Sequence, residues 1–93
     1  MVIGICNFAL HLPVIHSLKE KRSVIKPLIG RIRQRYNVSV AETGNQDKWQ
    51  LADIAVVCVS GDSMHAHRLL EQVISFIEGD SNLLIINVSL EII

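Results

Sequence analysis

The sequence predicts an α+β protein with the ferredoxin-like βαββαβ fold, in which two helices cover one face of a four-stranded antiparallel sheet. Four segments have the composition or alternation of strands, two carry apolar residues at helical spacing, and their order is β-α-β-β-α-β. Because β-α-β crossovers are right-handed, this order predicts the strand order 4-1-3-2. The 93 residues, 49% of them hydrophobic, suffice for a single domain over residues 1–93 with one core.

The first strand and the first helix each have a clear boundary. Val2–Leu12 alternates between two faces and ends at Pro13. Ser17-Leu18-Lys19-Glu20 is a capping box, which predicts a helix from Leu18 to about Tyr36. Pro27 lies inside this helix and should kink or divide it, because proline removes one backbone donor.

The remaining elements follow from turn residues and periodicity. Val38–Thr43 and Ala52–Ser60 are expected to form a hairpin, with Gly44, Asn45 and Asp47 in the connecting turn. A second helix follows Ser60-Gly61-Asp62-Ser63 and ends at about Glu78, before Gly79. Leu83–Ile93 alternates again and is the last predicted strand.

Positive charge is concentrated in the first helix. Residues 19–35 hold seven basic residues and one acid, a net charge of +6, whereas the other residues hold two basic and eight acidic residues, a net −6. The seven are Lys19, Lys21, Arg22, Lys26, Arg31, Arg33 and Arg35. Such a concentration attracts polyanions, RNA foremost among them.

Helical spacing divides these cations into groups. The basic ridge, which we define as Lys19, Arg22, Lys26 and Arg33, lies beside the buried stripe. Arg31 and Arg35 flank the other side, and Lys21 projects near the stripe, so it must extend along it toward water. These residues, Lys21 excepted, are candidate contacts to RNA phosphates; the alternative is an ordinary solvated helix face. The central strands offer no aromatic platform, so any RNA would be bound by its backbone and shape.

Two other surfaces are candidates for an alternative function, a dimeric domain that binds a protein or small ligand. The sheet face away from the helices is expected to be apolar, which favours a homodimer or a docked partner unless one strand is shifted by a residue. Its expected members are Ile3, Ile5, Ala9, Ala55, Val57, Val59 and Ile85. The hairpin loop offers Glu42, Gln46, Asp47 and Trp49 as a partner or ligand site, or as a polar loop with Trp49 packed beneath it.

No combination of residues completes a catalytic site, so we expect a binding protein and not an enzyme. His65 and His67 are two positions apart on a helix and cannot share a metal, and we expect neither a metal nor a cofactor. Cys6 and Cys58 lie in apolar strands, which favours buried free thiols and a cytoplasmic protein. No apolar run is long enough to cross a bilayer, so no membrane partner is expected.

Four segments of the chain resemble the YlxP-like family of small bacterial proteins. They are Ser17-Leu18-Lys19-Glu20-Lys21-Arg22, Arg31-Ile32-Arg33, Tyr36-Asn37-Val38-Ser39-Val40-Ala41-Glu42 and Gln46-Asp47-Lys48-Trp49-Gln50. The resemblance extends over essentially the whole chain and implies a ferredoxin-like fold and a cytoplasmic bacterial protein whose biochemical function is not established. Genes of that family often lie among genes for translation initiation and ribosome maturation, which implies a connection to RNA or the ribosome.

Overall fold

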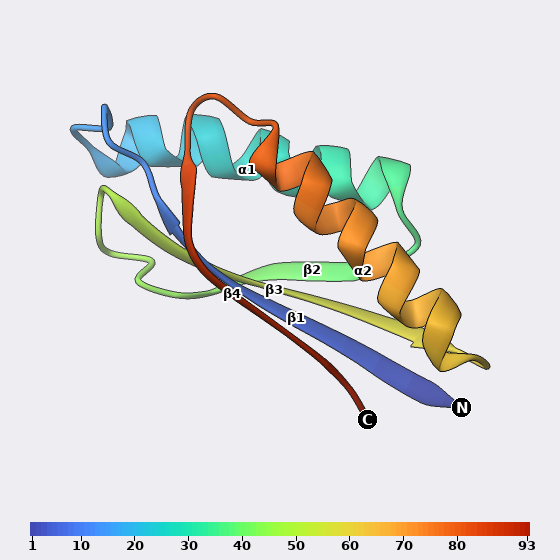
Figure 1. The fold of residues 1–93 in the computed structure, drawn as a ribbon. Coiled ribbons are helices and arrows are strands. Elements are labelled where there is room, and N and C mark those ends of the chain that lie inside the picture. The colour runs from blue at the N-terminus through green and yellow to red at the C-terminus, as the bar shows by residue number, and fades with distance from the viewer.

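The structure, a computed structural model, describes residues 1–93 and contains the six predicted elements in the predicted order (Figure 1). They are β1 (Val2–His11), α1 (Leu18–Arg35), β2 (Ser39–Gly44), β3 (Leu51–Ser60), α2 (Ser63–Glu78) and β4 (Leu84–Ile92). The observed strand ends differ from the predicted ones by a single residue, within the usual uncertainty of element boundaries.

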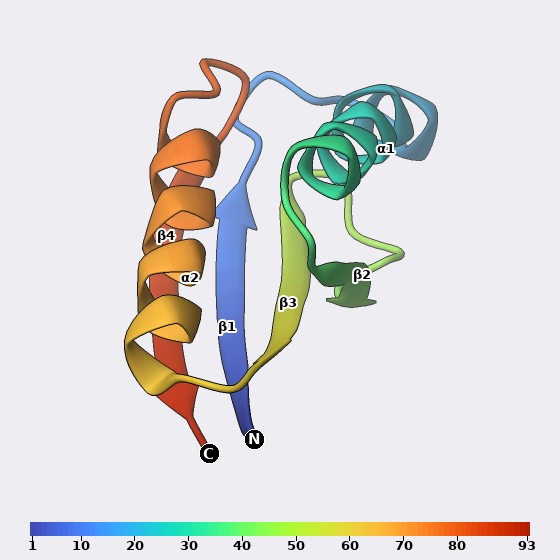
Figure 2. The same ribbon diagram turned by 90° about the vertical axis from the view of Figure 1, so that its right-hand side faces the viewer.

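The four strands form one antiparallel sheet in the order β2-β3-β1-β4, which is the predicted order read from the other edge. Strand β1 lies in the centre; it pairs along its whole length with β3 on one side, and from Gly4 to His11 with β4 on the other. Figure 2 shows both helices on the same side of the sheet, with α2 over β1 and β4 and α1 toward β3 and β2. The ferredoxin-like fold is therefore confirmed.

The core fills the space between the sheet and the helices. Even-numbered residues of β1 and β3 face it, as the alternation predicted, and they meet one apolar stripe from each helix. The strand residues are Cys6, Phe8, Leu10, Ala52, Ile54, Val56 and Cys58, and the helix residues are Ile25, Leu28, Ile32, Ala66, Leu70, Val73 and Ile77.

Both cysteines are buried and free, as predicted. Burial, with a smaller contribution from the negative charge of Glu71, raises the pKa of the Cys6 thiol to about 11. Because the thiolate is the nucleophilic and metal-binding form, Cys6 behaves as a small apolar side chain at neutral pH.

Strand β4 departs from the predicted alternation at a β-bulge. Ala9 is opposite Asn87 and Leu10 is opposite Ile85, so Ile86 has no partner and is 59% exposed. Because of this extra residue, the alternation of side chains between the two sheet faces is shifted by one residue before the bulge relative to after it. Ile85 therefore packs toward the core with Leu10, and its predicted place on the open sheet face is wrong. Asn87 occupies the open face instead.

Helix α1 is continuous through Pro27, which neither divides the helix nor ends it. Its N-terminus has the predicted cap, because the Glu20 amide donates to Ser17 Oγ at 3.1 Å. The Glu20 carboxylate reaches back and accepts from the amide of His16, also at 3.1 Å. Burial of Ile25, Leu28 and Ile32 on both sides of Pro27 holds the helix against the core and offsets the missing backbone bond.

Candidate functional site: the basic face of helix α1

Three of the predicted cations are exposed and have no acidic partner. Lys19, Arg22 and Lys26, which we call the basic triplet, occupy one side of the first turns of α1. No carboxylate oxygen lies within 4.0 Å of their charged nitrogens. The triplet is therefore the part of the basic segment that is free to meet an external anion.

The other three residues predicted to contact RNA interact with other parts of the protein. Arg33 Nη2 donates to the Val40 carbonyl at 2.9 Å, and Arg31 lies 3.6 Å from the Asp80 carboxylate. The guanidinium of Arg35 lies 5.0 Å from the ring centroid of Phe76, a cation–π distance. All three side chains remain exposed, but their contacts link α1 to β2, to α2 and to Asp80 in the loop after α2. These contacts make the three arginines less available to a ligand.

Two features of α1 leave the positive charge of the triplet without a compensating negative charge. The carboxylate of Glu20, the one acid of the segment, accepts a hydrogen bond from the His16 amide instead of pairing with the triplet. Lys19 and Arg22 also lie near the N-terminus, where the helix dipole is already positive and cations are unfavourable. An anion bound here would relieve both sources of repulsion.

Lys21 is buried and forms an ion pair that the sequence analysis did not predict. Its Nζ lies 2.9 Å from Glu42 Oε2 of β2 and donates to the Asn45 carbonyl at 2.6 Å. Lys21 is only 3% exposed and the Glu42 side chain 23%. The contact angle leaves the buried Oε2 without a well-directed hydrogen bond, so the attraction to Lys21 is mainly Coulombic. The predicted extension of Lys21 toward water is therefore wrong.

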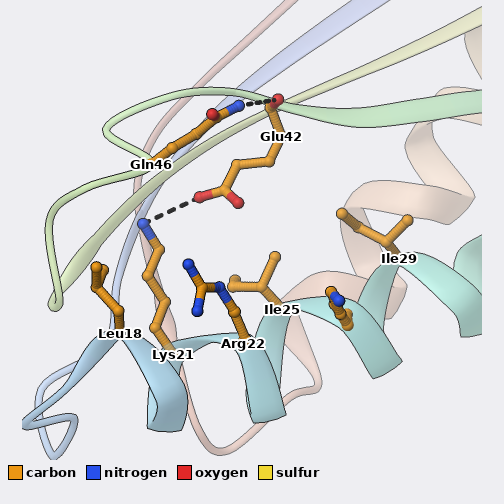
Figure 3. A pocket seen from close by; sticks show the side chains of 8 residues that line it. Leu18, Lys21, Arg22, Ile25, Ile29, Glu42 and Gln46 are labelled. Atoms are coloured by element: carbon orange, nitrogen blue, oxygen red, sulfur yellow. Dashed lines mark hydrogen bonds and ion pairs between the residues drawn. The ribbon is translucent and has the colours of Figure 1, made fainter.

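A pocket of about 310 Å³ lies between α1 and the β2–β3 hairpin (Figure 3). The ion pair of Lys21 with Glu42 lies at one side, and Arg22, Lys26 and Gln46 supply further polar groups. Leu18, Ile25 and Ile29 form the apolar part of its lining. The fold thus brings two separately predicted groups together, because Arg22 and Lys26 of the helix meet Glu42 and Gln46 of the hairpin.

The other two predicted loop residues lie at a different place. Asp47 and Trp49 line a shallow pocket of about 540 Å³ with His11 and Lys48. Trp49 is 52% exposed, so it does not pack beneath the loop as a buried anchor. The hairpin residues Glu42, Gln46, Asp47 and Trp49 consequently do not form one site.

Sequence reasoning missed the partner of Lys21 and therefore missed the pocket. The helical position of Lys21 beside the buried stripe did signal an unusual lysine, because buried lysines are nearly always paired. Its partner could not be chosen from the chain alone, since Glu42 is one of nine acids and becomes adjacent only when β2 packs beside α1.

The fold and this site define a class of protein, a small ferredoxin-like sandwich with a basic helix face and an adjoining pocket. The solved structure of the "De novo designed protein Foldit4" shares this fold, with a TM-score of 0.55 and 14% identity; the match covers 100% of this chain and 97% of that chain. Neither helix is long and apolar enough to cross a membrane.

Residues 3–90 match the family model described as "Protein of unknown function (DUF503)", and the chain belongs to this family. It is 39% identical over 62 residues to "Uncharacterized protein YlxP" of Bacillus subtilis (strain 168), a match that covers 67% of each chain. The resemblance to YlxP-like proteins noted in the sequence is thereby confirmed, and the function of the family is not established.

Proposed function

We propose that this protein is a non-enzymatic RNA-binding module that holds RNA phosphates on the basic triplet of α1. The observation that carries the proposal is the absence of any acid within 4.0 Å of Lys19, Arg22 and Lys26, although the chain as a whole is neutral. Cations that neutralise phosphates release condensed counterions, and this supplies most of the affinity in sequence-independent binding. Ribosomal RNA is one RNA that such a module could bind.

The triplet is short, which limits the contact. Lys19 and Lys26 are seven residues apart in α1, roughly 10 Å along the axis at 1.5 Å per residue. Arg33 extends the line by two further turns, although one of its nitrogens is bonded to Val40. The contact would therefore be made to a few consecutive phosphates, in keeping with a small accessory domain on a larger RNA.

Binding to single-stranded RNA should weaken steeply as salt rises. With three phosphate contacts, the logarithm of the association constant should fall with a slope of about −2 against the logarithm of salt concentration. Affinity should then drop about twentyfold between about 50 and 200 mM salt, which fluorescence anisotropy with a labelled oligouridine can measure.

The double variant Arg22→Glu/Lys26→Glu should abolish this binding. The matched control is Lys48→Glu/Arg68→Glu, which changes the net charge equally at two exposed cations outside α1 and should bind like the wild type. Equal loss in both variants would indicate a net-charge effect and not a site. Absence of wild-type binding at about 50 mM salt, where phosphate contacts are strong, would contradict the proposal.

A second candidate function, self-association through the open sheet face, is favoured by the apolar character of that face. Ile3, Ile5 and Val57 are partly exposed there, and Val59 is 66% exposed. If the face forms a dimer, Val59→Lys should shift the sedimentation coefficient from dimer to monomer. Met64→Lys, at a residue of α2 that is 65% exposed, is the control and should leave the dimer intact. A wild-type monomer at high concentration would exclude this candidate.

A further inference from the structure

We propose that the pocket between α1 and the hairpin binds one unstacked guanine base of an RNA strand whose phosphates lie on Lys19 and Lys26, while Arg22, the third member of the basic triplet, contacts the base. The inference rests on the proposed function and deepens it, because it adds a base preference to backbone binding. Its basis is a hydrogen-bond acceptor and a donor that face the same space without satisfying each other, next to an apolar lining.

The acceptor is the Glu42 carboxylate. Lys21 Nζ lies 2.9 Å from Oε2, and none of the side-chain hydrogen bonds or ion pairs around Glu42 ends on the other oxygen, Oε1. In Figure 3 this second oxygen points into the space in front of Arg22 and Ile25. Lys21 is buried and also bonded to the Asn45 carbonyl at 2.6 Å, so it fixes the direction of the carboxylate before any ligand arrives.

The donor is Arg22, which lines the same pocket but forms no ion pair with Glu42 within 4.0 Å. An oppositely charged pair that lines one pocket and stays apart leaves room for a group that serves both. Such a group must present acceptors to the guanidinium and a donor to the carboxylate.

Gln46 adds a second acceptor. Its Nε2 donates to the Glu42 backbone carbonyl at 3.0 Å, and this bond leaves the side-chain Oε1 without a partner. Gln46 and Glu42 thus both supply an acceptor from the hairpin side of the pocket that Arg22 lines from α1.

Among RNA bases, guanine matches this arrangement. Its O6 and N7 are the acceptors that arginine contacts bidentately, and its N1–H and N2 amino group are two adjacent donors. Uracil has a single ring donor, and adenine and cytosine each have one amino donor. Leu18, Ile25 and Ile29 would contact the faces of the base.

The Glu42 carboxylate also indicates whether a base or a phosphate of the RNA enters the pocket. The Glu42 carboxylate repels a phosphate that would lie against it, whereas Lys19, an exposed cation that does not line the pocket, favours a phosphate outside it. The volume of about 310 Å³ is at the small end of ligand pockets, which suits one base and not a larger ligand. Sequence-specific RNA recognition commonly works in this way, with unstacked bases bonded along their edges.

The test compares two oligonucleotides on the wild-type protein, an oligouridine of about twelve residues and the same strand with one central guanosine. Anisotropy at about 50 mM salt should show affinity about fivefold or more higher for the strand with guanosine, the gain expected of one well-formed base contact. A strand with inosine, which lacks the N2 amino group, should lose most of this gain.

Two variants localise the effect. Glu42→Gln should abolish the gain from guanosine, measured as the ratio of the affinities of that variant for the guanosine strand and for oligouridine. Because this substitution also weakens the pair with Lys21, Gln46→Ala at an exposed residue is the second variant, and it should reduce the gain without affecting folding.

The outcomes separate the two proposals. Equal affinity of the folded wild type for all three strands, with binding still lost in Arg22→Glu/Lys26→Glu, would overturn the guanine pocket and leave the RNA-binding proposal standing. No binding of any strand would overturn both. A guanosine gain that persists in both pocket variants would place base recognition elsewhere and overturn the pocket.

Discussion

Glu42→Ala should lower the free energy of unfolding by about 3 kcal/mol, because it leaves the Lys21 ammonium buried without its partner. Lys21 is 3% exposed and its Nζ lies 2.9 Å from Glu42 Oε2. The Asn45 carbonyl at 2.6 Å would remain as its single acceptor. Chemical denaturation followed by circular dichroism gives the free energies of unfolding of the two proteins directly.

Two controls show whether the loss comes from an unpaired buried charge. Lys21→Met/Glu42→Ala removes both charges and should recover most of the stability, since apolar replacement of a buried pair is often nearly neutral. Arg31→Ala breaks the exposed pair with Asp80, 3.6 Å apart, and should cost less than about 1 kcal/mol. A cost for Glu42→Ala as small as that of Arg31→Ala would mean that Lys21 swings out to water and that the pair does not hold the hairpin on α1.

Gly4→Ala should destabilise the protein by about 1–3 kcal/mol, the usual cost of adding a methyl group to a filled core. A Cβ at residue 4 would lie 2.8 Å from Leu70 Cδ1 and 2.9 Å from Cys58 Sγ, with Ala66 Cβ at 3.5 Å. The backbone of Gly4 needs no left-handed conformation, so the cost arises from close packing of β1 against α2 and β3.

Gly30→Ala is the matched control, because the same methyl group at that position meets no atom within 4 Å. Gly30 lies inside α1, where alanine is favoured over glycine, so this variant should gain about 0.5–1 kcal/mol. The melting temperatures of the two variants should therefore move in opposite directions from that of the wild type. A stabilised Gly4→Ala protein would show that Leu70 and Cys58 can move aside at little cost.

Local signals account for the parts of the fold that were predicted well. The Ser17 cap, the breaks at Pro13 and Gly79 and the alternation of β1 each depend on neighbouring residues, and each was found where expected. The facing of Ile85 failed because a bulge inserts one residue into the pairing of β4 with β1, and nothing in the alternation of Leu83–Ile93 marks the insertion.

The candidate site was predicted only in part, because helical spacing does not reveal contacts between α1 and the hairpin. Helical spacing correctly placed Lys19, Arg22 and Lys26 on one side of α1. It treated Arg33 as equal to them, although the Val40 carbonyl engages Arg33. It also separated Glu42 from the helix cations, whereas the pocket joins them.

By itself, the sequence determined the six elements, their order, the facing of the two central strands and the concentration of cations on the first helix. These properties follow from caps, turns and periodicity, which involve residues close together in the chain. Only the tertiary structure decided which cations are free, which lysine is buried and that Glu42 shares a pocket with Arg22. Those outcomes depend on contacts between residues far apart in the chain, such as Arg31 with Asp80 and Lys21 with Glu42, which exist only once the helices pack on the sheet.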